Sequence, residues 1–204
     1  MTVSPTLDAR FREAAAAAGL LDVAYDLAET PIGTLLVART DRGLCRISYD
    51  PQPEREAESL AHTFGVRVLR AARSIDPVRR QLDEYFEGKR TEFDLPIDLR
   101  HQAPFSRAVL DRLARVPYGH LTTYGALAAE AHRPKAARAV GTVMNRNPVP
   151  IVLPCHRVIG ANGSLTGYGG GLERKELLLK LEGALQPALS DAPPAAPSPP
   201  QFDV

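Results

Sequence analysis

The sequence has few cysteines, no long apolar run and almost no net charge. Only two cysteines, Cys45 and Cys155, occur among 204 residues. They are too few for a disulfide framework or, by themselves, for a four-ligand zinc site, and they suit a reducing compartment. No apolar run approaches the roughly 18 residues of a membrane span. Charged side chains also interrupt the N-terminal stretch that a signal peptide would keep apolar. We therefore expect a cytoplasmic protein without membrane contact.

The formal net charge of +1 conceals two segments of opposite sign. Residues 104–185 carry 11 basic and five acidic side chains, a net charge of +6. The rest of the chain carries 14 basic and 19 acidic side chains, a net charge of −5. A local excess of positive charge is typical of a surface that meets nucleic-acid phosphates. The hydrophobic content of 44% is that of an ordinary globular protein.

The first half of the chain predicts a small α/β domain behind a helical extension. Residues 7–20 are rich in alanine at helical spacing and predict the extension. Three β-type runs separated by turn residues follow, at 23–28, 33–39 and 44–49. Helices are expected at 54–64 and 76–88, and shorter extended segments at 66–69 and 93–99. Asp76 precedes a proline, so we expect it to be the N-cap of the second helix.

The second half of the chain changes to helical patterning after Pro104. Apolar residues within 105–116 share one helix face. Thr122 or Thr123 is expected to cap a short helix, and another helix is predicted over 135–145. Two short helices joined by a tight polar turn form the helix-turn-helix pattern, although most such pairs in unrelated proteins only pack together.

These patterns divide the chain into four parts. They are a helical extension (1–21), an N-terminal α/β domain (22–100), a C-terminal domain (104–185) and a disordered tail rich in proline and alanine (186–204). The tail is expected to be disordered because its composition cannot bury enough apolar area to fold alone.

Cys155 is followed directly by His156, an arrangement that can make a nucleophile. A thiol attacks as the thiolate, and an imidazole that takes its proton directly or through one water can supply that form. Two such residues by themselves are more often an inert structural pair, because free cysteine is often simply buried. Neighbouring residues on a strand point to opposite faces, so this pair must lie at a turn or be bridged by water.

Five segments around this pair occur in a characteristic order. They are Pro-Lys-Ala-Ala-Arg-Ala-Val-Gly at 134–141, Asn-Pro-Val-Pro-Ile at 147–151, Pro-Cys-His-Arg-Val at 154–158, Tyr-Gly-Gly-Gly at 168–171 and Leu-Glu-Gly at 181–183. Together they resemble the active-site domain of the O6-alkylguanine-DNA alkyltransferases, also called methylated-DNA–protein-cysteine methyltransferases. Residues 22–99 are similar to the N-terminal domain of that family in length and in Asp-Glu-Tyr-Phe-Glu-Gly at 83–88.

The resemblance implies an α+β fold of two domains. The N-terminal domain would be a small, ribonuclease H-like α/β domain with an antiparallel three-stranded sheet. The C-terminal domain would be a helix-turn-helix, winged-helix-like active-site domain. The glycine-rich stretch 160–171, which lacks the Gly-Lys-Ser/Thr of a phosphate-binding loop, would close over the bound base.

The resemblance also implies a reaction and a role for each catalytic residue. Cys155 would take the alkyl group from guanine O6, and also from thymine O4, in one in-line displacement that leaves a permanent thioether. His156 would accept the thiol proton through a water, and Glu182 would orient the imidazole. Tyr124 would give its hydroxyl proton to guanine N3. Asn147 would hold the Cys155 segment by hydrogen bonds to its backbone.

The partner implied by the resemblance is double-stranded DNA that contains O6-alkylguanine. The target nucleotide would be flipped out of the duplex, with Arg138 entering the vacated space from the minor groove. Further DNA contacts are expected from Ser106, Arg133, Lys135, Ala136, Ala137 and Gly141. The base pocket is expected to contain Pro150, Val158, Tyr168, Gly169 and Gly170. The protein would act as a monomer, and cooperative binding along DNA stays open.

No metal or cofactor is expected, and three other functions stay open. Cys45 is the only cysteine of the N-terminal region, and His62 and His101 form no ligand spacing with it, so Cys45 is expected to be a bystander. A sensor of alkylated DNA would share the fold but lack the nucleophile, which Cys155 argues against. A Cys-His hydrolase would leave the basic helix pair unexplained. A transcription factor would leave Cys155 inert.

Overall fold

A four-stranded sheet forms the centre of the N-terminal half in the computed structural model, which describes residues 4–185. The first three strands run antiparallel in sequence order: β1 (Val23–Ala28), β2 (Leu35–Thr40) and β3 (Gly43–Tyr49). The expected antiparallel three-stranded sheet is therefore present. A fourth strand, β4 (Val68–Arg70), pairs parallel to β1 and gives the order β3-β2-β1-β4. The tail at 186–204 lies outside the described residues.

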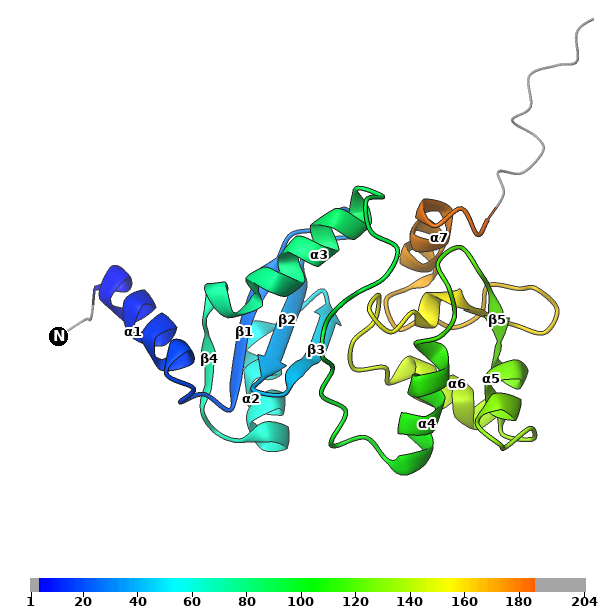
Figure 1. Ribbon diagram of the computed structural model, residues 1–204, viewed down its shortest axis with the longest axis horizontal. Coiled ribbons are helices and arrows are strands. Elements are labelled where there is room, and N and C mark those ends of the chain that lie inside the picture. Colours follow the sequence, from blue (N-terminus) through cyan, green and yellow to red (C-terminus); the bar gives the residue numbers. More distant parts are fainter. Residues whose placement is uncertain (1–3, 186–204) are drawn as a thin grey trace, which may run out of the picture.

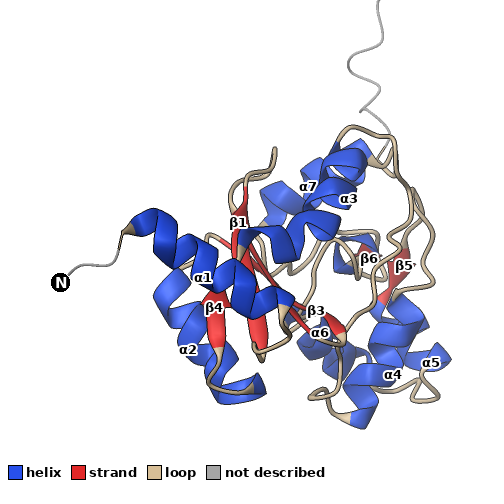
Figure 2. Ribbon diagram, turned by 60° about the vertical axis from the view of Figure 1, so that its left-hand side comes forward, coloured by secondary structure: helices blue, strands red, loops and turns tan. Residues whose placement is uncertain are grey.

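Helices cover both faces of this sheet, which explains why β2 is apolar at successive positions. Leu35 and Val37 face one core cluster together with residues of α3 (Asp76–Phe86). Leu36 and Ala38 face a second cluster that includes Leu60 of α2 (Pro53–Phe64). α2 and α3 accordingly lie on opposite sides of the strands (Figures 1 and 2). A strand buried on both faces cannot show the alternation of a half-exposed strand.

The start of α3 corrects one expectation. Asp76 is the first residue of α3 and not its N-cap, because the short 3₁₀ helix η1 (Ala72–Ile75) runs directly into it. Asp76 has helical backbone angles, whereas an N-cap residue keeps a non-helical backbone. Its carboxylate forms an ion pair with Arg79 instead. At the start of α5 the expectation is confirmed, since the Thr123 hydroxyl accepts a hydrogen bond from the Ala126 amide.

The C-terminal half is mainly helical. Its elements are α4 (Pro104–Leu113), β5 (Thr122–Thr123), α5 (Tyr124–Glu130), α6 (Ala137–Asn145), η2 (Cys155–Arg157), β6 (Val158–Ile159) and α7 (Leu172–Leu181). β5 and β6 form a short parallel pair that joins the start of α5 to the end of η2. The N-terminal α1 (Pro5–Ala17) lies at the opposite end of the molecule from α5 (Figure 1). No helix among the described residues is long and apolar enough to cross a membrane.

The two halves share one hydrophobic core. Leu82 and Tyr85 of α3 belong to the same buried cluster as Leu110 of α4 and Leu178 of α7. A backbone hydrogen bond from Ile47 of β3 to the Pro148 carbonyl, 2.8 Å long, adds a polar link. The sheet therefore packs directly on the segment that carries Cys155.

The hairpin between β2 and β3 requires glycine at position 43, and this gives a test of the fold. Gly43 has φ of +139°, and a Cβ atom there would lie 2.2 Å from the Pro96 carbonyl oxygen. We expect Gly43→Ala to lower the free energy of unfolding by about 3 kcal/mol, because backbone strain and a backbone clash add together. Urea denaturation followed by circular dichroism measures the loss.

Gly88→Ala is the matched control. Gly88 also has a positive φ, +69°, but open space surrounds its Cβ position. Its substitution is expected to cost only about 1 kcal/mol, from backbone strain alone. Equal losses in the two variants would contradict the clash with Pro96.

Candidate active site

Glu182, directly after α7, accepts hydrogen bonds from three buried side chains and one backbone amide. Its Oε1 accepts from His156 Nε2 at 2.8 Å, from Arg157 Nη2 at 2.8 Å and from the Tyr85 hydroxyl at 2.7 Å. Its Oε2 accepts from Arg157 Nε at 2.8 Å and from the Gly119 amide at 3.3 Å. Burial alone would raise the pKa of Glu182, but the hydrogen bonds from His156 and Arg157 outweigh it and lower the pKa to about 2. The carboxylate is therefore ionised at neutral pH.

This carboxylate determines the state of His156. An ionised carboxylate only accepts hydrogen bonds, so Nε2 of His156 must carry the proton and Nδ1 has a free lone pair. Nδ1 is buried and has no hydrogen-bond partner among the described residues. Burial lowers the pKa of His156, and the charges of Arg157 and Lys175 act in the same direction against the support of Glu182. The imidazole is thus a neutral base at pH 7.

Cys155 begins the 3₁₀ turn η2, so the adjacent thiol and imidazole lie at a turn. The side chain is buried, with an exposed fraction of 5% for the residue. Burial raises the pKa of the Cys155 thiol to about 11, although the Asn147 side chain, nearby backbone amides and the charge of Lys175 oppose the shift. The thiol is protonated at rest and must lose its proton in order to react.

A cavity of about 240 Å³ opens onto Cys155. Four residues expected in the base pocket line it: Pro150, Tyr168, Gly169 and Gly170. Val158 does not, because it is fully buried in β6. The N-terminal half also contributes to the wall, where the Tyr49 and Tyr168 hydroxyls are hydrogen-bonded at 2.6 Å. A Cβ atom on Gly170 would lie 2.7 Å from the Tyr49 ring and 2.9 Å from the Tyr168 ring, so the wall needs glycine there.

Asn147 organises the loop that precedes Cys155. Its amide nitrogen donates to the Leu153 carbonyl at 2.7 Å, and its oxygen accepts from the Val149 amide at 3.1 Å. The loop includes Ile151 with φ of +74°, which is unusual for a β-branched residue. The hydrogen bonds of Asn147 stabilise this strained turn and fix the position of Pro150 within it.

Some of the residues expected to face DNA line a common hollow. Tyr124, Ala137, Arg138 and Gly141 line a shallow hollow of about 470 Å³ together with Gly125 and Ala161. The Tyr124 hydroxyl donates to the Thr166 carbonyl at 3.0 Å, so the loop 160–171 lies against it.

Four other expected DNA contacts do not line this hollow: Ser106, Arg133, Lys135 and Ala136. Ser106 lies in the first turns of α4, and the others precede α6. Arg133 is exposed, with its guanidinium 5.6 Å from the centre of the Phe105 ring.

Four residues of the site are not singled out by sequence reasoning: Tyr49, Tyr85, Arg157 and Lys175. Lys175 is fully buried, and its ammonium donates to the Val158 carbonyl at 2.6 Å and to the Thr166 carbonyl at 2.9 Å. Burial lowers the pKa of Lys175, which Cys155 partly opposes. The position of Lys175 was detectable, because it shares helical spacing with the buried Leu178 and Leu179.

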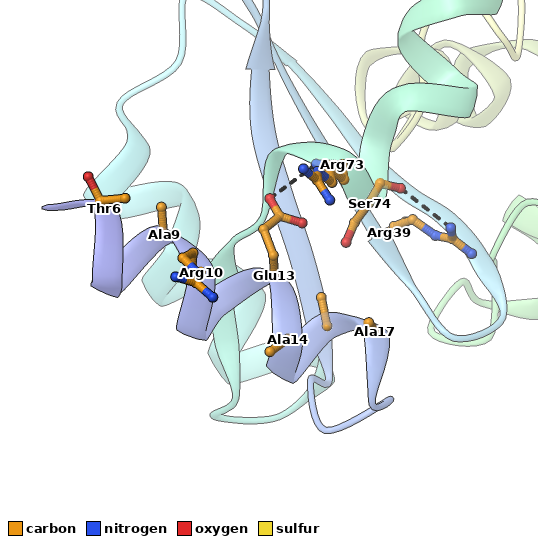
Figure 3. A pocket seen from close by; sticks show the side chains of 10 residues that line it. Thr6, Ala9, Arg10, Glu13, Ala14, Ala17, Arg39, Arg73 and Ser74 are labelled. Carbon is orange, nitrogen blue, oxygen red and sulfur yellow. Dashed lines mark hydrogen bonds between the residues drawn. The ribbon is translucent and has the colours of Figure 1, made fainter.

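A hollow larger than the cavity at Cys155, about 780 Å³, lies beside α1, and Cys155 is not among the residues that line it (Figure 3). Arg10 and Glu13 of α1 line it together with Arg39, Arg73 and Ser74. Glu13 accepts a hydrogen bond from the Arg73 amide at 3.2 Å, which ties α1 to η1. Neither cysteine nor histidine lines this hollow, so it offers no nucleophile of the kind found at Cys155. No cluster of three or more metal-ligating side chains occurs within residues 4–185.

Comparison with known proteins gives two family matches that cover most of the chain. The 6-O-methylguanine DNA methyltransferase, DNA binding domain, matches residues 104–184. The 6-O-methylguanine DNA methyltransferase, ribonuclease-like domain, matches residues 23–99.

Individual relatives and solved structures agree with the family matches. The methylated-DNA–protein-cysteine methyltransferase of Methanosarcina acetivorans is 41% identical over 160 residues, which is 78% of this chain and 98% of the relative. That of Mycolicibacterium paratuberculosis is 43% identical over 166 residues, 81% of this chain and 96% of the relative. The crystal structure of Mycobacterium tuberculosis O6-methylguanine methyltransferase has a TM-score of 0.67 at 41% identity, covering 81% of this chain and 96% of that one. The structure of Mycobacterium tuberculosis OGT in complex with DNA has a TM-score of 0.69 at 39% identity, covering 78% and 92%.

The depressed pKa of Glu182 predicts a specific loss of stability in acid. A carboxyl group whose pKa is lower in the folded state stabilises that state above its unfolded pKa, and this contribution disappears as the pH falls through the folded pKa. For Glu182 the loss runs from about pH 5 to about pH 2 and amounts to about 3 kcal/mol. Urea denaturation over this range should show a smaller acid loss in Glu182→Gln than in wild type.

Glu176→Gln provides the control for this experiment. Glu176 lies on α7 as well, in an exposed pair with Lys180, and its substitution should leave the acid dependence unchanged. Asp98, whose pKa is also lowered to about 2, is present in all three proteins and contributes equally. An acid dependence of Glu182→Gln that matches wild type would contradict the pairing of Glu182 described above.

Proposed function

This chain belongs to the 6-O-methylguanine DNA methyltransferase family, and we propose on that basis that it repairs DNA by moving the alkyl group of O6-alkylguanine onto its own Cys155. The reaction occurs once per molecule, and thymine O4 is attacked in the same way. The observation that carries the proposal is the buried pair of His156 and ionised Glu182, next in sequence to a buried Cys155 that lines a cavity. A nucleophile, a base and a group that orients the base are thereby combined.

The chemical step is a single in-line displacement. The sulfur of Cys155 forms a bond to the alkyl carbon while the bond from that carbon to guanine O6 breaks, and the electron pair passes to the base. The thiol proton passes through one water to Nδ1 of His156, whose lone pair is free. Because the thiol has a raised pKa, its deprotonation is linked to substrate binding and does not precede it. The thioether product offers no leaving group, so the protein is not regenerated.

Tyr124 supplies the proton that the departing base needs. Its hydroxyl gives up the hydrogen bond to the Thr166 carbonyl and protonates guanine N3, so that the base leaves neutral instead of as an anion. The same movement frees the loop 160–171 to close over the flipped base, with Tyr168 as one wall. Asn147 holds the loop that carries Pro150 throughout the reaction.

The basic segment 104–185 is the DNA-binding and alkyl-transfer domain in this proposal, and 22–100 is its supporting α/β domain. α6 enters the minor groove, since Ala137 and Gly141 are small enough to let it approach closely beside Arg138. Ser106, Arg133 and Lys135 contact phosphates at the edge of the minor groove. The protein works as a monomer in the cytoplasm, where a reducing environment preserves the free thiols of Cys45 and Cys155.

The proposal predicts a change of mass on one residue. Intact-protein mass spectrometry after incubation with duplex O6-methylguanine DNA should show the addition of one methylene mass on Cys155. Cys155→Ala should show none, and Cys45→Ala should react like wild type, because Cys45 is buried in the N-terminal core. Multiple turnovers would contradict the mechanism. Sequence-specific DNA binding without transfer would favour a transcription factor, and hydrolysis of an ester would favour a Cys-His hydrolase.

Arg138 is predicted to act on duplex DNA and not on the chemistry. We expect Arg138→Ala to slow repair of a duplex about a hundredfold, because the cost of flipping a base is a few kcal/mol. Reaction with free O6-benzylguanine, which needs no flipping, should change less than about threefold. Lys180→Ala, which removes an exposed positive charge that pairs with Glu176 on α7, is the control. Equal losses with duplex and free base would contradict the flipping role.

A further inference from the structure

One side chain of the N-terminal half reaches the hydrogen-bond cluster of Glu182. Tyr85 lies in the last turn of α3 and is fully buried. Its hydroxyl donates to Oε1 of Glu182 at 2.7 Å. Oε1 is also the oxygen that accepts from Nε2 of His156. The supporting domain thus contacts the catalytic base through a single intervening carboxylate.

Packing does not explain the hydroxyl group of Tyr85. Its ring lies among aromatic neighbours, 5.3 Å from the centres of Phe86 and Phe93 and 6.1 Å from that of Tyr118, which a phenylalanine would contact equally well. A buried hydroxyl is costly unless it is hydrogen-bonded. Glu182 is the one side-chain partner of this hydroxyl in the part of the chain that the structure describes. Burial also raises the pKa of Tyr85 far above its ordinary value, so the group donates at any working pH.

We propose that Tyr85 is a positioning residue for alkyl transfer, which fixes Glu182 so that His156 presents Nδ1 to the thiol of Cys155. The inference rests on the proposed function. Three donors share Oε1: His156, Arg157 and Tyr85. Arg157 spans both carboxylate oxygens, and Tyr85 approaches from α3, so the carboxylate cannot rotate about its last bond without losing a partner. A fixed acceptor gives the imidazole a fixed orientation.

The hydroxyl also limits how strongly Glu182 binds the imidazole. When Oε1 loses one donor, its remaining hydrogen bonds strengthen, and a stronger bond to Nε2 favours the imidazolium. The charged groups that act on His156 are Glu182 and Lys175 of the α7 region and Arg157 of η2. The titratable thiol of Cys155 precedes it in η2 and is neutral at rest. Tyr85 and Tyr118 face the carboxylate from the other side. Loss of the Tyr85 hydroxyl should therefore raise the pH below which His156 is protonated and inactive.

Tyr118 offers a matched control. Its ring is next to that of Tyr85, and its hydroxyl donates to the Leu181 carbonyl at 3.0 Å and not to the carboxylate of Glu182. Tyr118→Phe therefore removes the same atom from the same neighbourhood without changing the acceptor of His156.

The test is the single-turnover rate of methyl transfer from duplex O6-methylguanine, measured between pH 5 and pH 9 on the full chain. Tyr85→Phe should be about tenfold slower at its optimum, and its acid limb should move up by about 0.5 pH unit or more. Tyr118→Phe should stay within about twofold of wild type, with the acid limb unmoved. A Tyr85→Phe profile with the wild-type acid limb would overturn the inference, whatever the change in rate.

A second variant keeps the test decisive if Tyr85→Phe does not fold. Incorporation of 3-fluorotyrosine at position 85 keeps the ring and the donor but makes the hydroxyl more acidic, so the acid limb should move down. An unmoved or raised limb would overturn the inference. If wild type itself places no methyl group on Cys155, the proposed function fails. If wild type reacts and the acid limbs do not move, only the role of Tyr85 fails.

Discussion

The buried carboxylate of Glu182 is the constraint on which the rest of the site depends. A carboxylate with an exposed fraction of 5% for its residue is tolerated only when donors surround it, and here they come from η2, from α3 and from the turn after α4. The same donors keep it ionised, and an ionised carboxylate can only accept hydrogen bonds. The Nε2 atom of His156 must therefore carry the proton. The catalytic tautomer is therefore a consequence of how a buried charge is stabilised.

The N-terminal half has a more direct part in the site than a separate scaffold would have. Its core is continuous with that of the C-terminal half, and its side chains reach the two places where the chemistry is controlled. Tyr85 donates a hydrogen bond to Glu182, the carboxylate that orients His156. Tyr49 is hydrogen-bonded to Tyr168, which lines the cavity beside Cys155. α7 strengthens this junction, because Arg174 pairs with Asp50 and also donates to the carbonyls of Ile32 and Gly170. The cavity beside Cys155 is consequently built by both halves.

Local features of this molecule could be predicted from sequence, and contacts between distant residues could not. The strand at 23–28 and the cap at Thr123 depend on neighbouring residues, and both expectations are confirmed. The expectation that Asp76 is an N-cap is wrong because η1 continues into α3, which a pattern of single residues does not reveal. The resemblance brought Cys155, His156 and Glu182 together in advance. The hydroxyl of Tyr85 joins residues 97 positions apart, and no spacing rule predicts such a contact.

The reactivity of the site depends on an ionised Glu182 that holds His156 as a neutral base with the proton on Nε2. The most direct measurement is a pH titration of the His156 imidazole by ¹⁵N NMR in the unalkylated protein. The hydrogen bond to Glu182 and the lowered pKa of His156 predict the Nε2-protonated neutral tautomer at pH 7, with protonation of Nδ1 only below the ordinary pKa of histidine. An imidazolium at pH 7, or a neutral ring with the proton on Nδ1, would contradict it.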